Sequence, residues 1–203
     1  MSLVLIIIGI TVLISFSVEN KPELKEKLLF IPYQIKHQGE YQRMISSIFI
    51  HADINHLAFN MISLYFLGNL FEQQMNQIYG SQLGSVNFLL LYFLGGVAAE
   101  IYPFIRHQND VYYRSLGASG AVSAVIFAAI FWNPTMDLFL FFIPIPIPAY
   151  IFGPIYLAFE YFSMKSGKTN IAHDAHIGGA LFGILFVLLL NSNKGIEFFE
   201  AIF

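Results

Sequence analysis

Apolar residues of this chain gather into six long runs, separated by polar stretches that hold most of the charged residues. As a helix, about 20 apolar residues cross the roughly 30 Å hydrocarbon core of a bilayer. The pattern therefore predicts an all-α, polytopic membrane protein, with a single domain over residues 1–203 and six transmembrane helices. The expected helices cover about residues 2–18, 55–72, 85–101, 117–132, 149–162 and 171–191.

The connections between these helices carry signals of their own. The first loop, residues 19–50, is long and polar, and we expect it to hold short amphipathic helices in the membrane interface. Asn133-Pro134 is expected to end the fourth helix. Alternate residues of the run 143–148 are prolines without an N–H, so this run is expected to be an extended surface segment. Because no Lys or Arg precedes the first apolar run, a membrane helix is favoured there over a cleaved signal peptide.

Composition supports a membrane protein and excludes other classes. The chain is 57% hydrophobic and 11% charged, far more apolar than an average soluble domain. With 10 Lys+Arg against 13 Asp+Glu it has a formal net charge of −3 and no basic block, which argues against a nucleic-acid partner. Cysteine is absent, so any catalysis must use oxygen or nitrogen groups. Nothing in the sequence indicates the oligomeric state.

Strongly polar residues are rare in the predicted helices, and such residues are candidates for a functional site. His56 and Asn60 are four residues apart and share one face of the second helix. With six spans, the second, fourth and sixth helices run in the same direction across the bilayer. His56, Ser119 and His176 each lie near the start of one of them. We therefore expect the three side chains at one depth in the membrane.

Ser119 lies in the motif Gly117-Ala118-Ser119-Gly120, which has two interpretations. Structurally, glycines let membrane helices approach each other, and a lone serine can bond to its own helix. Functionally, Ser119 would be a nucleophile if a base stood beside it. Gly179 and Gly183 give the sixth helix a face on which the fourth helix can pack closely, and this packing would bring His176 to Ser119.

A serine beside a neutral histidine can attack a carbonyl, because the imidazole takes the hydroxyl proton and returns it to the leaving group. The Ser119 backbone N–H, the Asn60 amide and an N–H of His56 would then stabilise the oxyanion. Asp174 is two residues from His176 and faces elsewhere on the helix, so the sequence predicts a Ser–His dyad. Neither a metal nor a cofactor is expected, because the histidines form no H-E-x-x-H motif or other ligand pattern.

Three motifs occur in a fixed order: H-x-x-x-N at residues 56–60, G-x-S-G at 117–120 and A-H-x-x-G at 175–179. With them the chain resembles the rhomboid intramembrane serine proteases. The resemblance implies a six-helix rhomboid-like bundle and the hydrolysis of peptide bonds in or near transmembrane helices of substrate proteins in a lipid bilayer. It implies the following roles: Ser119 as nucleophile, His176 as base, His56 and Asn60 as oxyanion stabilisers, and His51, Arg43, Glu72, Gly117, Gly120 and Gly179 as supporting residues.

The chain departs from the family pattern at two positions. Many bacterial members carry a tyrosine that stacks on the catalytic imidazole, and Ser123 stands at that position here. An aromatic residue often precedes the loop arginine, and here it is Gln42. Another group must therefore orient His176. The alternative interpretation is a catalytically silent rhomboid-like protein that binds membrane clients.

The resemblance also implies an orientation. It places the N-terminus in the cytoplasm and opens the active site toward the non-cytoplasmic side, with a bacterial-type cell membrane as the expected location. However, nine of the ten Lys and Arg residues lie in loops on the active-site side, and Lys194 is the exception. The positive-inside rule therefore favours the reverse insertion.

Overall fold

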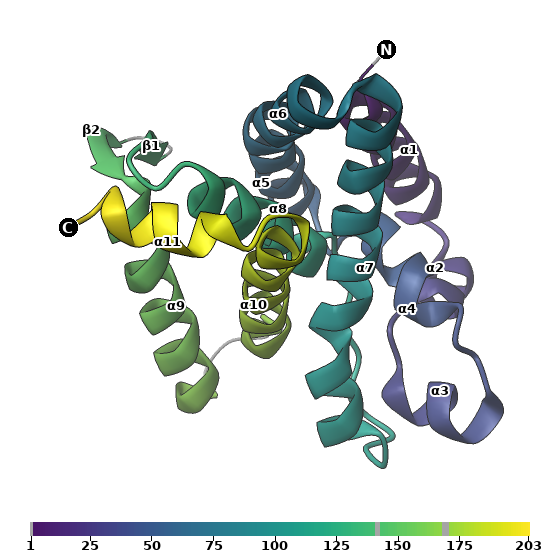
Figure 1. The fold of residues 1–203 in the computed structure, drawn as a ribbon. Coiled ribbons are helices and arrows are strands. Elements are labelled where there is room, and N and C mark those ends of the chain that lie inside the picture. The colour runs from purple at the N-terminus through teal and green to yellow at the C-terminus, as the bar shows by residue number, and fades with distance from the viewer. Residues whose placement is uncertain (1, 141–142, 168–170) are drawn as a thin grey trace.

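The computed structural model describes residues 2–140, 143–167 and 171–203, and most of its regular structure is helical (Figure 1). The elements are α1 (Leu3–Val18), α2 (Pro22–Leu28), α3 (Pro32–Gln38), α4 (Arg43–Ser46), the 3-10 turn η1 (Ser47–Phe49), α5 (Ile54–Ser63), the π-helical segment η2 (Leu64–Gly68), α6 (Asn69–Tyr79), α7 (Ser81–His107), α8 (Ser119–Trp132), β1 (Asp137–Leu140), β2 (Ile143–Pro148), α9 (Ala149–Ser166), α10 (His173–Leu190) and α11 (Asn193–Glu200).

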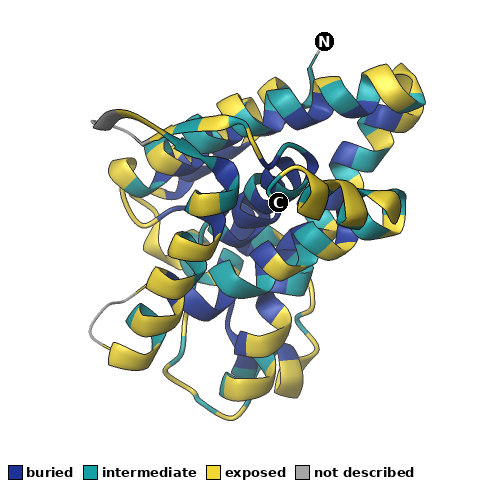
Figure 2. Ribbon diagram, turned by 60° about the vertical axis from the view of Figure 1, so that its left-hand side comes forward, coloured by how far each residue is buried: buried dark blue, intermediate teal, exposed yellow. Residues whose placement is uncertain are grey.

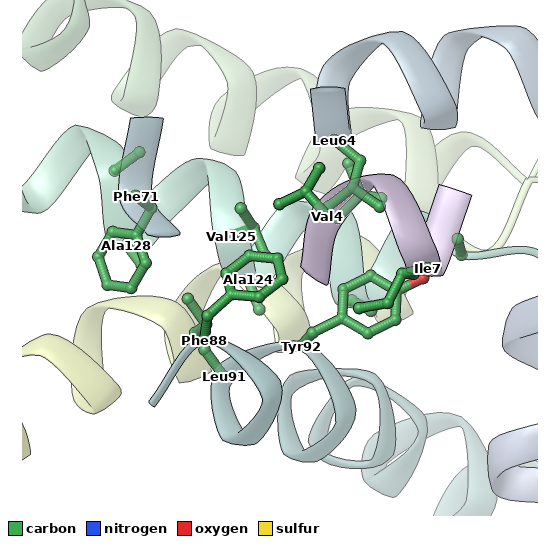
Figure 3. Close-up of a cluster of buried hydrophobic side chains, with 14 of the residues drawn as sticks. Val4, Ile7, Leu64, Phe71, Phe88, Leu91, Tyr92, Ala124, Val125 and Ala128 are labelled. Atoms are coloured by element: carbon green, nitrogen blue, oxygen red, sulfur yellow. The ribbon is translucent and has the colours of Figure 1, made fainter. Parts of the chain in front are cut away.

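Helix α8 forms the centre of the molecule and packs against α7 and α10. The hairpin of β1 and β2 lies with α9 on one side of this centre, and α1 to α4 lie on the other (Figure 1). Nearly every residue of α8 is buried, and burial is concentrated around it (Figure 2). Its Ala124, Val125 and Ala128 meet side chains from α1 and α7 in the core (Figure 3). These neighbours include Val4, Ile7, Phe88, Leu91 and Tyr92.

Glycines allow α8 and α10 to touch through their backbones. A Cβ added to Gly179 would overlap the carbonyl oxygen of Gly120, and one added to Gly183 would overlap that of Ala124. The close approach expected from the small residues of both helices is therefore confirmed. It fixes how far the start of α10 lies from the start of α8.

The outer faces of the helices are apolar, as expected for contact with lipid. Leu13, Phe66 and Leu189 are 72%, 66% and 74% exposed. By length and apolarity, α7 and α10 qualify as membrane spans, whereas α1 and α8 are apolar but have 16 and 14 residues. The structure therefore does not confirm the count of six spans. Helix α8 is surrounded by other helices, so it contacts protein rather than lipid and need not match the thickness of the bilayer.

The predicted helix bounds agree best for α1, α8 and α10, which begin and end within two residues of expectation. The second predicted helix, 55–72, instead continues through α5, η2 and α6 to Tyr79. The third, 85–101, extends over Ser81–His107, and the fifth, 149–162, continues to Ser166. Helix α11 was not predicted. Its apolar residues are too few to separate it from a polar tail by pattern alone.

The polar first loop does contain the expected short helices, α2, α3 and α4. The run 143–148 is extended, as expected, but it is not an isolated segment. It pairs antiparallel with β1, so that Leu138 lies opposite Ile147 and Asp137 opposite Pro148. Because the sheet has two strands, each strand has one unpaired edge, where a missing proline N–H is tolerated.

Glu72 lies at the opposite end of the molecule from the starts of α8 and α10. Its Oε1 accepts the N–H of Leu3 at 2.8 Å, and its Oε2 accepts the hydroxyl of Ser2 at 2.6 Å. A carboxylate at the first turn of a helix satisfies N–H groups that have no intrahelical acceptor and is favoured by the helix dipole. Glu72 therefore holds the start of α1 against α6.

Candidate active site

One cavity of about 820 Å³ opens between α5, α8, α9 and α10. His56, Asn60, Ser119 and His176 all line it. The structure thus brings together the three side chains that the sequence places at one depth, and Asn60 lines the same cavity. Val122, Ser123, Ile126 and Tyr156 form much of the remaining wall.

The turn before α8 depends on Gly117. Its φ of +118° is unfavourable for other residues, and a Cβ there would lie 2.6 Å from Cε1 of His56. Its N–H donates to the carbonyl of Ser47 at 3.0 Å. Gly117 therefore gives the chain its turn into α8 and lets the imidazole of His56 lie against the backbone. Ser119 follows as the first residue of α8.

His51 lies behind this turn, outside the cavity lining. Its Nε2 accepts the N–H of Ala118 at 3.3 Å, so its Nδ1 carries the hydrogen. Nδ1 then donates to Oγ of Ser15 at 3.0 Å, and Ser15 donates to the carbonyl of Phe49 at 2.9 Å. This chain of hydrogen bonds ties the end of α1 to the residue before Ser119.

Acidification should weaken this support. Burial, followed by the nearby groups His56 and Lys25, lowers the pKa of His51 to about 3, against an opposing effect of Asp53. The unfolded chain therefore takes up a proton first as the pH falls below about 6.5. The neutral His51 stabilises the fold at pH 7, and this contribution declines as the pH falls toward 3, by about 2 kcal/mol at pH 5.

Thermal unfolding in detergent at pH 7.5, 6 and 5 measures this effect, with His51→Gln as the comparison. Glutamine keeps one acceptor and one donor but does not titrate in this range. The stability difference between the wild type and His51→Gln should shrink as the pH falls. A difference that stays constant from pH 7.5 to 5 would contradict the assignment of a depressed pKa to His51.

Asn60 and Arg43 have different positions relative to the cavity. The Asn60 amide donates to the carbonyl of His56 at 3.0 Å, at the cavity wall. Arg43 is buried outside it, where its Nη1 donates to the carbonyls of Glu26 and Leu29 at 2.7 and 2.9 Å. Arg43 therefore holds the first loop together, and Glu72 is remote from the cavity.

Ser123, at the position of the family tyrosine, contacts a tyrosine from another helix. Oγ of Ser123 lies 3.2 Å from the hydroxyl of Tyr156, which reaches the cavity wall from α9. A larger side chain at position 123 would compete with Tyr156 for this space. Among the described residues, the ring of His176 lies against that of His173, with centroids 6.1 Å apart and an interplanar angle of 78°.

Sequence reasoning missed the role of Glu160 in this arrangement. Its Oε1 lies 3.1 Å from Nδ1 of His176, and its Oε2 lies 2.5 Å from Nδ1 of His173. His173 and Asp174, at the start of α10, are not in water as helix-start residues usually are, because they are 4% and 8% exposed. His173 packs against α9 through Glu160. The available signal was a carboxylate in a strongly apolar helix.

These side chains also have the composition of a metal site, because the potential ligand atoms of Glu160, His173 and His176 all lie within 4.8 Å of one another. Two ligands of one tetrahedral zinc ion stand about 3.3 Å apart when the bonds are roughly 2.0–2.1 Å long. Oε2 of Glu160 and Nδ1 of His173 are closer, at 2.5 Å, which fits a hydrogen bond rather than a shared ion. The expectation of no metal site rested on histidine spacing and did not consider Glu160.

Comparison with known proteins gives a consistent result. A family model described as Rhomboid domain matches residues 38–193. RHOMBOID-like protein 12, mitochondrial, of Arabidopsis thaliana is 32% identical over 70% of this chain and 44% of its own length. Rhomboid protease GluP of Bacillus subtilis is 29% identical over 77% of this chain and 27% of its own length. Presenilin-associated rhomboid-like protein, mitochondrial, of Homo sapiens is 32% identical over 71% and 36%. The chain thus spans less than half the length of each of these relatives.

Proposed function

The chain belongs to the rhomboid family, and from this premise we propose that it is an intramembrane serine protease acting on peptide bonds in or near the transmembrane helices of other membrane proteins. The observation that carries the proposal is the cavity that Ser119 and His176 line together with His56 and Asn60. A nucleophile, a base and oxyanion donors are the groups that acyl transfer from a peptide requires.

In the proposed reaction, Oγ of Ser119 attacks the carbonyl carbon of the peptide bond while the imidazole of His176 takes the hydroxyl proton. The imidazole then gives this proton to the leaving amine as the carbon–nitrogen bond breaks, which leaves an ester on Ser119. Water, deprotonated by His176, hydrolyses the ester and restores the hydroxyl. General acid–base catalysis of this kind contributes about 10² to 10⁴-fold.

The negative oxygen formed during attack needs donors on the same cavity wall. Ser119 is the first residue of α8, and N–H groups in the first turn of a helix have no intrahelical acceptor. The Asn60 amide carries a second hydrogen besides the one that it gives to the carbonyl of His56. With an N–H of His56, these donors would stabilise the oxyanion, each contributing roughly 10² to 10³-fold.

As a rhomboid family member the chain is an integral membrane protein. Mitochondrial names among its relatives argue against the bacterial-type cell membrane expected from the sequence. The N-terminal end of α1 contacts Glu72, whereas its far end contacts His51 near the cavity. We therefore place the opening of the active site on the side of the membrane opposite the N-terminus, which is the non-cytoplasmic side if the N-terminus is cytoplasmic.

A fluorophosphonate probe, which reacts with activated serines, distinguishes this protease from a catalytically silent membrane-client binder. Folded protein in detergent should be labelled at Ser119, as located by peptide mass spectrometry, and Ser119→Ala should not be labelled. Unfolding the wild-type protein before adding the probe should also prevent labelling, because the base is then no longer beside the hydroxyl. Folded wild-type protein without label would favour the silent binder.

A further inference from the structure

A buried carboxylate faces the proposed base from a different helix. Glu160 is 4% exposed, and it lies in α9 after the apolar residues Leu157, Ala158 and Phe159. A charged group removed from water is costly unless it is paired. Its partners are His173 and His176, which are three residues apart on α10 and therefore face α9 together.

The two oxygens of this carboxylate have separate partners. Oε2 lies 2.5 Å from Nδ1 of His173, a contact that prevents the carboxylate from turning away. Oε1 is thereby aimed at Nδ1 of His176, at 3.1 Å. Although this distance is short, the geometry at Nδ1 of His176 is not straight enough for a hydrogen bond to Glu160, and Nδ1 has no hydrogen bond to another acceptor among the described residues. Hydrogen bonds of active sites are often poorly aligned before substrate binds and tighten afterwards.

This arrangement selects the form of the imidazole. An ionised carboxylate only accepts hydrogen bonds, so the ring nitrogen facing it must carry the hydrogen. With the hydrogen on Nδ1, Nε2 of His176 keeps its lone pair and can take a proton from Ser119. When the ring becomes positive during the attack, the negative charge of Glu160 stabilises it.

We propose that Glu160 is a positioning residue for His176, held in place by His173, so that the dyad predicted from the sequence works as a carboxylate–imidazole–hydroxyl triad. This inference rests on the proposed protease function. It supplies the orienting group that the imidazole needs where Ser123 replaces the family tyrosine. Asp174, the acidic neighbour in the sequence, is two residues from His176 and so faces another side of α10, where its Oδ1 accepts the N–H of Ala175.

The test is steady-state cleavage of a model transmembrane substrate by purified protein in detergent. Glu160→Gln keeps the shape of the side chain but removes its charge, and kcat should fall by about 10² to 10⁴-fold while KM changes little. Glu160→Asp keeps the charge farther from the ring and should restore part of kcat. The matched control is Glu100→Gln, which alters another buried carboxylate on α7 and should leave kcat within about threefold of the wild type.

Three outcomes would overturn the inference: a kcat of Glu160→Gln close to that of the wild type, a rise in KM with unchanged kcat, or an equal loss in Glu100→Gln. If Glu160→Gln does not fold, Glu160→Asp serves as the test. An intermediate kcat at unchanged KM would support the triad, and a wild-type kcat would reject it. Failure of the protease function itself is separate. It would appear as cleavage that persists in Ser119→Ala.

Discussion

Cleavage of a transmembrane substrate should fall by about 10³-fold or more when Ser119 is replaced by alanine, and by a similar factor in His176→Ala. The two losses should be similar because the hydroxyl and the imidazole act in one proton transfer, which cannot take place when either group is missing. For the same reason, the double variant Ser119→Ala/His176→Ala should be no slower than either single variant. The decrease should lie in kcat, since neither side chain is needed to dock the substrate helix.

Initial rates with a fluorescent transmembrane peptide in detergent give this measurement. Ser192→Ala and His37→Ala are suitable controls, because both residues are exposed and lie outside the cavity lining. Both control variants should keep the wild-type rate. Equal cleavage by wild type and Ser119→Ala, or losses that multiply in the double variant, would show that Ser119 and His176 are not a nucleophile and its base.

Sequence reasoning succeeded where the signal is local. Helices α8 and α10 were placed within two residues because a long apolar run and its polar flanks define a membrane-type helix directly. Their mutual contact was also predictable. Gly179 and Gly183 lie one helical turn apart, and small residues on α8 offer the complementary surface.

Glu160 was missed because its function depends on a contact between two helices. It lies thirteen residues before His173, on the far side of the loop between α9 and α10. Whether it faces the histidines depends on how α9 is rotated against α10, which the weak apolar periodicity of α9 does not define. Asp174 is the nearest acidic residue in the sequence, but a spacing of two residues places it on a different face of α10 from His176.

The remaining errors in the fold have the same origin. The second predicted helix ends at residue 72, where the apolar run gives way to polar residues. In the structure Glu72 is buried by the start of α1, and the helix continues to Tyr79. The proline run is extended as expected, but its pairing was not predicted, because its partner strand, β1, has no strong pattern of its own. In both cases the deciding contact is made with another element, α1 for Glu72 and β1 for the proline run.

Replacing Gly179 by alanine should separate α8 from α10 and remove activity. The added Cβ would overlap the carbonyl oxygen of Gly120, and backbone cannot move aside as a flexible side chain can. Overpacking of this kind costs about 1–3 kcal/mol or more. The shift would also act directly on the reaction, because α10 carries His176 and α8 carries Ser119. A misplacement of about 1 Å can lower a rate by about 10²-fold.

Two other helical glycines provide matched controls for this prediction. A Cβ at Gly9 on α1 would meet no atom within 4 Å, and one at Gly153 on α9 would lie 3.6 Å from side chains on α8. Alanine at either site should leave the unfolding temperature and the cleavage rate close to the wild-type values. The loss of stability and activity caused by Gly→Ala should therefore depend on how much room an added Cβ has at each position, and not on the loss of a glycine as such. If Gly179→Ala behaved like Gly9→Ala in both measurements, the backbone contact of α8 with α10 would not be what holds His176 beside Ser119.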